Sequence, residues 1–281
     1  NIRCHYNISM SLFIPYYVSK KERINKLVFS GGSTKGISYI GIIKGLEEKN
    51  LFKDIKTFAG TSIGAIFSFL LTIGYDYYSL NSTIKSIDIE KLCKINKMSS
   101  YGFDDGVNLV SMIKELMDKK NIKHDITFKE LFKLTNKRLI ITVTNLTLKK
   151  AEYLDYKRTP DMNVLIGLRM SFSVPIVFKP IIYNGCYYVD GGLVDNLPVG
   201  IFKNKDKCLC VYIDSEFVIN STVNYLMSLF DFIGSTKNIK EMNLKNIITL
   251  NITMSCTNFK FNIDEINKLV EYGYSIFNDW Y

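Results

Sequence analysis

Two glycine-rich turns, each lying between an apolar strand pattern and an apolar helix pattern, constrain the fold of this chain more than any other feature. The first follows the run KLVFS at residues 26–30 and precedes isoleucine and leucine at helical spacing in residues 37–46. The second follows residues 57–59 (TFA) and opens the apolar run of residues 63–73. Strand, sharp turn and helix in repeated order predict an α/β fold with a mostly parallel sheet covered on both faces.

The second turn has the sequence G-x-S-x-G, from Gly60 through Ser62 to Gly64. Between a strand and a helix this sequence is typical of a nucleophile elbow, in which small flanking residues let the turn close around the serine. The N-terminus of the following helix favours negative charge beside that serine. The pentapeptide alone is as typical of an ordinary turn. Its context therefore carries the prediction that Ser62 is a nucleophile.

The first turn, residues 31–36 (GGSTKG), presents backbone N–H groups to an anion and is predicted to form an oxyanion hole. A phosphate-binding loop would require lysine where Ile37 stands. A dinucleotide-binding fingerprint would require glycine where Ser33 stands. The alternative left open is a glycine turn that only reverses the chain.

A late D-G-G sequence, Asp190 to Gly192, follows the apolar run YYV at residues 187–189. We interpret this run as a strand that delivers Asp190 to a sheet edge, where its carboxylate can serve as the base for Ser62. D-G-G is also a good hairpin turn, which is the structural alternative. The rival bases are acids beside other apolar runs or turns: Asp104, Asp105 and Asp214.

The chain has two histidines, His5 and His124, and neither follows Asp190. In an α/β-hydrolase the triad order is serine, acid, histidine, so a histidine after the acid is expected. The missing histidine therefore argues against an ordinary α/β-hydrolase, and we interpret both histidines as surface residues.

Four sequence blocks match a known family in order. They are the glycine loop at residues 31–36, the elbow at 58–65, the run SFSVP with Phe178 at 171–178, and YVDGG with the following NLP at 188–198. On these residues the chain resembles the patatin-like phospholipases. The resemblance implies a three-layer α/β sandwich with a mostly parallel central sheet, and a catalytic dyad of Ser62 and Asp190. It also implies an oxyanion hole formed by Gly31, Gly32 and Ser33. The supporting motif residues that it implies are Lys35, Gly36, Gly60, Gly64, Gly191 and Gly192.

Two positions of the glycine loop need separate treatment. Ser33 stands where family members usually carry a third glycine, and serine is less favourable than glycine if that position needs a positive φ. Lys35 occupies the family's basic position. It is expected to support the loop or to face lipid head groups, and a solvated surface lysine is equally compatible with the sequence.

Strand and helix patterns alternate along residues 26–281, which we interpret as one patatin-like domain preceded by a capping or truncated segment at residues 1–25. Strands are expected at residues 26–30, 56–60, 138–145, 151–156, 187–189, 208–213 and 246–252. Helices are expected at residues 37–49, 63–74, 107–120, 127–134, 222–233 and 263–277. No run is long enough to predict a transmembrane helix.

The net charge of +9 is compatible with a solvated surface, or with attraction to anionic lipid. The lysines are scattered without a recognition helix or an aromatic RNA-binding signature, so no nucleic-acid partner is expected. The six cysteines form no disulfide framework, which favours a reducing compartment. The expected location is cytoplasmic with peripheral membrane association, and the oligomeric state stays open.

The predicted function is a lipid acyl hydrolase of the phospholipase A type that cleaves carboxylic esters of membrane phospholipids. The chemistry needs no cofactor, and the histidines and cysteines show no zinc-binding spacing. Two alternatives stay open. One is a catalytically silent lipid-binding or interaction protein on the same fold, and the other is a hydrolase of different acyl esters or thioesters.

Overall fold

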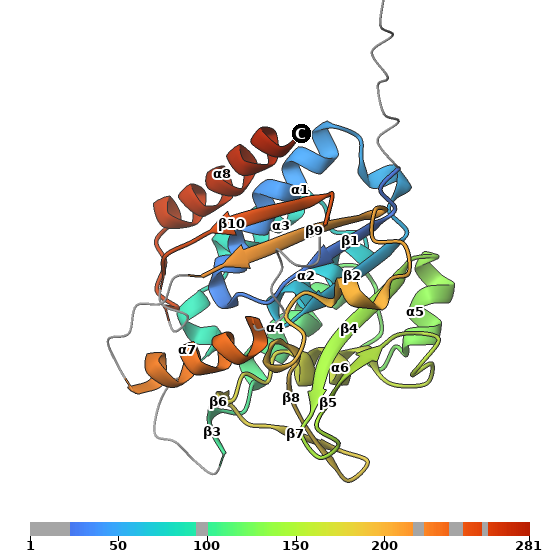
Figure 1. Cartoon of the computed structure of the whole chain (residues 1–281), viewed down its shortest axis with the longest axis vertical. Helices are drawn as coiled ribbons and strands as arrows, with labels where there is room; N and C mark the ends of the chain where they lie inside the picture. Colours follow the sequence, from blue (N-terminus) through green and yellow to red (C-terminus); the bar gives the residue numbers. More distant parts are fainter. Residues whose placement is uncertain (1–22, 94–100, 216–221, 236–243, 255–257) are drawn as a thin grey trace, which may run out of the picture.

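The computed structural model describes residues 23–93, 101–215, 222–235, 244–254 and 258–281, which form an α/β fold around one large sheet (Figure 1). The strands are β1 (Lys26–Phe29), β2 (Thr57–Thr61), β3 (Gly102–Asp104), β4 (Arg138–Asn145), β5 (Lys150–Leu154), β6 (Ile176–Phe178), β7 (Ile181–Tyr183), β8 (Cys186–Asp190), β9 (Cys208–Asp214) and β10 (Ile247–Asn251). The α-helices are α1 (Tyr39–Glu48), α2 (Ile63–Thr72), α3 (Tyr77–Ser86), α4 (Val107–Asp118), α5 (Phe128–Thr135), α6 (Val164–Ser171), α7 (Thr222–Ser235) and α8 (Ile263–Trp280).

The main sheet has eight strands in the order β10-β9-β1-β2-β4-β8-β7, with β5 paired to β4. Strands β10, β9, β1, β2 and β4 run parallel, whereas β5, β7 and β8 form antiparallel pairs at the other end of the sheet. Strands β3 and β6 form a separate two-stranded sheet. The predicted α/β class and mostly parallel central sheet are confirmed.

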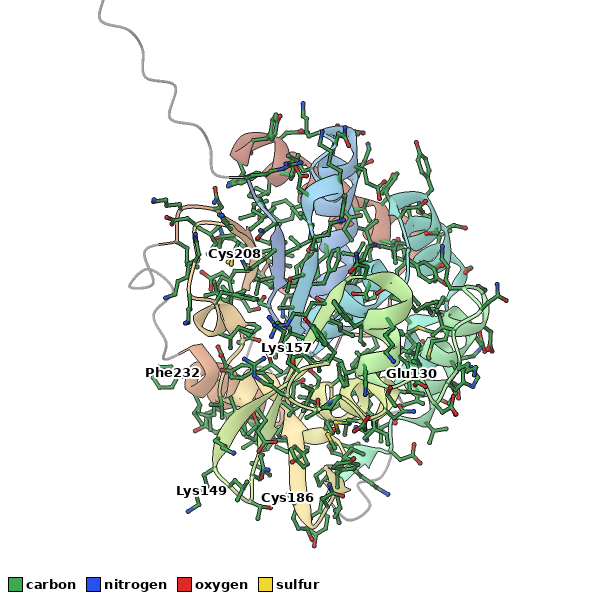
Figure 2. All side chains as sticks on the ribbon, turned by 90° about the vertical axis from the view of Figure 1, so that its right-hand side faces the viewer. Glu130, Lys149, Lys157, Cys186, Cys208 and Phe232 are labelled. Carbon is green, nitrogen blue, oxygen red and sulfur yellow. The ribbon has the colours of Figure 1, made fainter. Side chains whose placement is uncertain are left out.

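The two faces of the sheet are covered unequally. Alternate residues of β1 point to opposite faces, so Leu27 and Phe29 join a large core with the helices, while Val28 joins a smaller one. The smaller core is closed by Val199 of the short helix η5 (Pro198–Ile201) and by neighbouring loop residues, and it contains Cys208 (Figure 2). Coverage on both faces was predicted, but the second layer is thin.

Helices α1 and α8 pack closely side by side because glycines replace side chains at their contact (Figure 1). A Cβ on Gly41 would lie 2.0 Å from the carbonyl oxygen of Val270, and one on Gly273 would lie 2.0 Å from that of Ser38. Neither backbone atom can move without shifting its helix. This contact holds the C-terminal helix against the helix that follows the first glycine loop.

Every strand and helix predicted from the sequence is present, with ends displaced by a few residues. The structure adds α3, α6 and the short strands β3, β6 and β7, which the sequence patterns did not predict. Residues 1–22, including His5, lie outside the described residues, so the division of the chain at residue 25 stays a prediction. Among the described helices, none combines the length and the apolar character needed to cross a membrane.

Candidate active site

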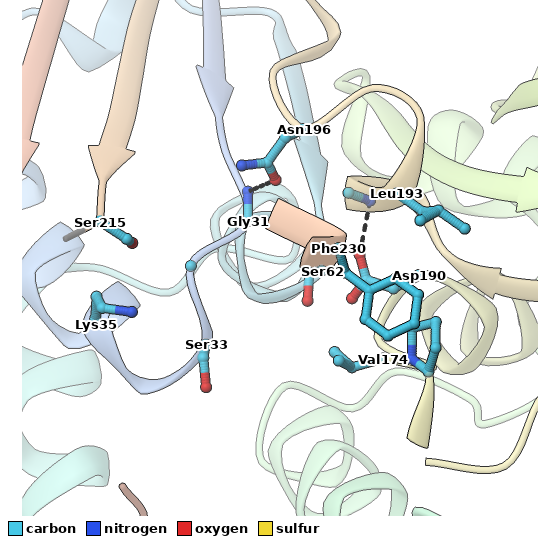
Figure 3. Close-up of a pocket in the computed structure, with 13 residues that line it drawn as sticks. Gly31, Ser33, Lys35, Ser62, Val174, Asp190, Leu193, Asn196, Ser215 and Phe230 are labelled. Carbon is cyan, nitrogen blue, oxygen red and sulfur yellow. Dashed lines mark hydrogen bonds between the residues drawn. The ribbon is translucent and has the colours of Figure 1, made fainter. Parts of the chain in front are cut away.

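Strands β2 and β8 meet end to end along one edge of β4. Strand β2 runs parallel to β4 and reaches the pair Thr61–Thr142, whereas β8 runs antiparallel and ends at the pair Asp190–Val143. Both lie on the same edge, because β5 occupies the opposite edge of β4 over residues 141–145. The residue after β2 and the last residue of β8 therefore converge. They are Ser62 and Asp190, and both line one cavity (Figure 3).

The chain turns sharply at Ser62, which has φ 55° and ψ −125° immediately before α2. A positive φ at a serine is strained and persists only where the surroundings enforce it. Here the flanking glycines permit the turn: a Cβ at Gly60 would lie 2.3 Å from the backbone of Gly64, and one at Gly64 would lie 2.4 Å from the Ser30 oxygen. The small residues predicted for a nucleophile elbow are thus required by backbone contacts.

Asp190 is buried, and its two carboxylate oxygens differ in their contacts. Oδ1 accepts a hydrogen bond of 2.7 Å from the Gly192 amide. Oδ2 is buried and accepts no hydrogen bond of standard geometry from the described residues. Burial raises the pKa of Asp190 to about 7, an effect that the nearby Ser62 hydroxyl and the Gly192 amide partly offset. An aspartate in this state can take up a proton near neutral pH.

The first glycine loop lies directly against Ser62, as a Cβ on Gly31 would be 3.2 Å from the Ser62 Cβ. The Gly31 amide is already engaged, because it donates 2.9 Å to the Asn196 side-chain oxygen and 3.3 Å to the Asn196 carbonyl. The Gly31 amide therefore has partners within the chain, and the oxyanion hole of Gly31, Gly32 and Ser33 stays a prediction. Ser33 has φ 55°, so the positive φ at which serine is less favourable than glycine is indeed required there.

Lys35 is not a solvated surface lysine, since only 1 % of it is exposed. It lines the same cavity as Ser62 and Asp190 (Figure 3). The alternative that Lys35 is a solvated surface lysine is therefore wrong. Gly36 lies against the elbow as well, because a Cβ there would be 2.5 Å from the Ile63 side chain.

The turn that ends α6 touches the backbone of both Ser62 and Asp190. The buried Ser171 hydroxyl accepts 2.9 Å from the Ser62 amide and donates 2.7 Å to the Thr142 carbonyl. Two residues on, the Ser173 carbonyl accepts 3.0 Å from the Asp190 amide. The sequence matched residues 171–178 to a family but indicated no role for them. One turn therefore fixes the backbone positions of both residues.

Two adjoining cavities meet at Ser33 and Ser62. The first has a volume of about 90 Å³, is lined by the glycine loop and Asp190, and includes Phe230 of α7 at its wall. The second has a volume of about 120 Å³ and is almost entirely apolar. Its walls come from α2, α4 and the segment after α6: Ile63, Ile66, Leu109, Phe172, Val174, Val177 and Phe178 are among them. A long aliphatic group fits such walls better than a polar one.

The described residues considered as alternative bases or as a triad histidine line neither cavity. His124 pairs with Asp118 at 2.8 Å on the exposed surface, and neither it nor Asp214 lines either cavity. Asp104 accepts 2.6 Å from the Gly106 amide in the turn before α4, and the adjacent Asp105 carbonyl accepts from Arg169. No group of three or more histidine, cysteine or acidic residues in the described ranges is placed to hold a metal ion.

The family model described as patatin-like phospholipase matches residues 27–203 of the chain. A probable lipid hydrolase of Invertebrate iridescent virus 6 is 37% identical over 206 residues, which are 69% of this chain and 70% of that protein. Lysophospholipase NTE1 of Candida albicans is 28% identical over 209 residues, which are 73% of this chain but 14% of that much longer protein.

Among solved structures, VipD from Legionella pneumophila has the same fold. It superposes with a TM-score of 0.68 at 20% identity, over 92% of this chain and 67% of that chain. At this identity the likeness concerns the fold alone.

Proposed function

Because the chain belongs to the patatin-like phospholipase family, we propose that it is a phospholipase A-type acyl hydrolase that cleaves carboxylic esters of membrane phospholipids with a Ser62–Asp190 dyad. The observation that supports this most is the meeting of the strained Ser62 elbow with a buried aspartate whose pKa is raised to about 7. An ordinary aspartate is too weak a base to accept a serine proton efficiently near neutral pH. A raised pKa brings the proton affinity of Asp190 closer to the working pH.

The reaction proceeds in two halves. The Ser62 oxygen attacks the ester carbonyl carbon as its proton passes to Asp190, and the negatively charged carbonyl oxygen accepts hydrogen bonds from the Gly32 and Ser33 amides. The tetrahedral intermediate then collapses, and the alcohol leaves with the proton from Asp190. Water next attacks the acyl-enzyme while Asp190 takes its proton. Collapse of this second intermediate releases the fatty acid and returns the proton to Ser62.

The apolar cavity beside Ser62 is proposed to hold the acyl chain. It shares Ser33 and Ser62 with the cavity that contains Asp190, so a chain placed in it leaves its carbonyl next to both the nucleophile and the glycine loop. Burial of each methylene contributes about 0.8 kcal/mol. The binding energy therefore comes mainly from the chain, and the alcohol portion of the lipid faces the more polar cavity.

A panel of diacyl phospholipids, triacylglycerols and acyl thioesters with mass-resolved products tests this substrate class. We expect equal amounts of fatty acid and lysophospholipid from the phospholipids, also in the presence of EDTA, since no step uses a metal ion. If products form only from thioesters or triacylglycerols and not from phospholipids, the protein has instead the second candidate activity, hydrolysis of other acyl compounds. Loss of activity on chelation, restored by calcium, would contradict the proposed mechanism.

Ser171→Ala should lower kcat about tenfold to a hundredfold and leave KM within about twofold. The variant leaves the Ser62 amide and the Thr142 carbonyl without their buried partner, so the nucleophile shifts although no contact with the substrate is removed. Ser173→Ala is the matched control. Its hydroxyl lies in the same buried turn but bonds to Arg169, and its carbonyl still holds Asp190. Equal kcat losses in both variants, measured on a short-chain ester, would show a general loss of packing instead of positioning.

A further inference from the structure

Helix α7 lies next to the catalytic aspartate. It packs against the short helix η4 (Gly191–Leu193), which begins directly after Asp190. Its residue Phe230 lines the cavity that contains Ser62 (Figure 3). A lipid that enters this cavity can therefore contact α7 at Phe230.

The helix exposes four of its apolar side chains and buries a polar one. Asn224 is 3 % exposed, whereas four apolar residues point to solvent: Tyr225 at 50 %, Leu229 at 41 %, Phe232 at 69 % and Ile233 at 51 %. These four stand at positions i, i+4, i+7 and i+8, which form one face of a helix. Such a stripe ordinarily faces the protein core. We call these four residues the α7 stripe.

The surroundings of the α7 stripe indicate a lipid partner. Strands β9, β1, β2 and β4 run parallel, so the turn that follows β4 lies at the edge of the sheet where β9 ends, and α7 is the next described helix after β9. That turn exposes Leu146 and Leu148 next to Lys149 and Lys150. In Figure 2, Phe232 and Lys149 lie on the same side of the molecule. Exposed apolar groups flanked by lysines suit an anionic bilayer surface.

We propose that the α7 stripe is the surface by which the protein docks on a lipid bilayer, with the entrance to the Ser62 cavity facing the acyl chains. This inference rests on the proposed function, because it takes the substrate to be a lipid within that bilayer. Amphipathic helices bind at the bilayer interface through their buried apolar area. Docking through this helix carries the ester to the cavity without movement of the lipid through water.

The test is the double variant Leu229→Ser/Phe232→Ser, compared with the control Leu134→Ser/Tyr78→Ser. The control residues are at least as exposed, at 63 % and 77 %, but lie on α5 and α3 and do not line the cavity. Each pair is made in the wild-type chain for activity and in Ser62→Ala for binding. Vesicles of phosphatidylcholine mixed with phosphatidylserine are sedimented with the protein, and p-nitrophenyl butyrate serves as a monomeric ester.

We expect the α7 variant to lose about tenfold or more in both vesicle binding and vesicle hydrolysis, since two large apolar contacts are removed. Hydrolysis of p-nitrophenyl butyrate should stay within about twofold of wild type, which also shows that the variant folds. The control pair should match wild type in every assay. Wild-type vesicle binding by the α7 variant would overturn the proposal.

Two further outcomes distinguish a lipid bilayer from a second copy of the chain as the partner of the α7 stripe, and the docking proposal from the proposed hydrolase function. If wild type is a dimer in light scattering, and the α7 variant is a monomer that binds vesicles normally, the stripe is an interface between copies and the docking proposal fails. If the variant loses vesicle binding while wild type hydrolyses neither ester, docking stands and the proposed hydrolase function fails.

Discussion

Replacing Ser62 by alanine should lower ester hydrolysis by a factor of about 10⁴ or more, with the fold unchanged. The hydroxyl is the group that attacks, and its loss leaves only the glycine-loop amides to stabilise the reacting carbonyl. Asp190→Asn should be nearly as damaging, because the amide keeps the shape of the carboxylate and can still accept from Gly192 but cannot take the Ser62 proton. The measurements are kcat on a short-chain ester and covalent labelling by a fluorophosphonate, which should mark wild type and not Ser62→Ala.

His124→Gln is the control that separates a dyad from a triad. His124 pairs with Asp118 on the surface, so its replacement should leave both labelling and kcat near wild type. An inactive His124→Gln protein with normal folding would contradict the dyad. So would continued labelling of Ser62→Ala at the wild-type rate, since the reactive group would then be another residue.

The parts of the site that could be predicted are those encoded in short, local sequence motifs. Gly60 and Gly64 are required because backbone atoms lie within 2.4 Å of where their Cβ atoms would be, and such a requirement leaves a motif. The strand that carries Asp190 is apolar and ends in D-G-G, which likewise can be recognised locally. Regular alternation of strand and helix patterns then gave the fold class.

Contacts between distant segments left no such signal. Asn196 accepts a hydrogen bond from the Gly31 amide across 165 positions, and no motif marks this pairing. Lys35 is buried, and a lysine in a polar loop carries no mark of burial in the sequence. Helix α6 was missed because nearly all of its eight residues are buried, so no polar face gives it a helical period.

Helix α7 shows a different limit of sequence reasoning. Its apolar spacing predicted a helix over residues 222–233, and α7 spans Thr222–Ser235. The spacing alone implies that the stripe faces the core, yet in the structure the stripe faces solvent. A hydrophobic period shows that one face needs an apolar neighbour, but it does not say whether that neighbour is the protein or a lipid.

The second large effect is a pH dependence set by Asp190, the base in the proposed reaction. Its pKa is raised to about 7, and only the ionised form can accept the Ser62 proton. For the free enzyme, kcat/KM should therefore fall about tenfold per pH unit below pH 7 and level off above it. With p-nitrophenyl butyrate, the value near pH 5 should be about a hundredfold below that near pH 9. A profile that is flat across this range would exclude Asp190 as a base with a raised pKa.

Because its pKa is raised, the ionised form of Asp190 destabilises the folded protein. The pKa is higher in the folded protein than the ordinary 3.8, so the folded state holds the proton more tightly than the unfolded chain. The contribution of Asp190 to stability is full below pH 3.8 and is lost as the pH rises through about 7. A shift of this size corresponds to roughly 4 kcal/mol.

Asp190→Asn removes this ionisation, so near pH 8 the variant should have a higher free energy of unfolding than wild type, by up to roughly 4 kcal/mol. Near pH 4 the two proteins should be almost equally stable, since Asp190 is then neutral in the folded protein. Urea unfolding at both pH values measures the difference, with Asp214→Asn as the control for an exposed aspartate at the end of β9. Equal stabilities at both pH values would mean that burial does not raise the Asp190 pKa. A more stable but inactive Asp190→Asn protein would show instead that the burial which adapts this carboxylate for proton transfer is the same burial that destabilises the fold.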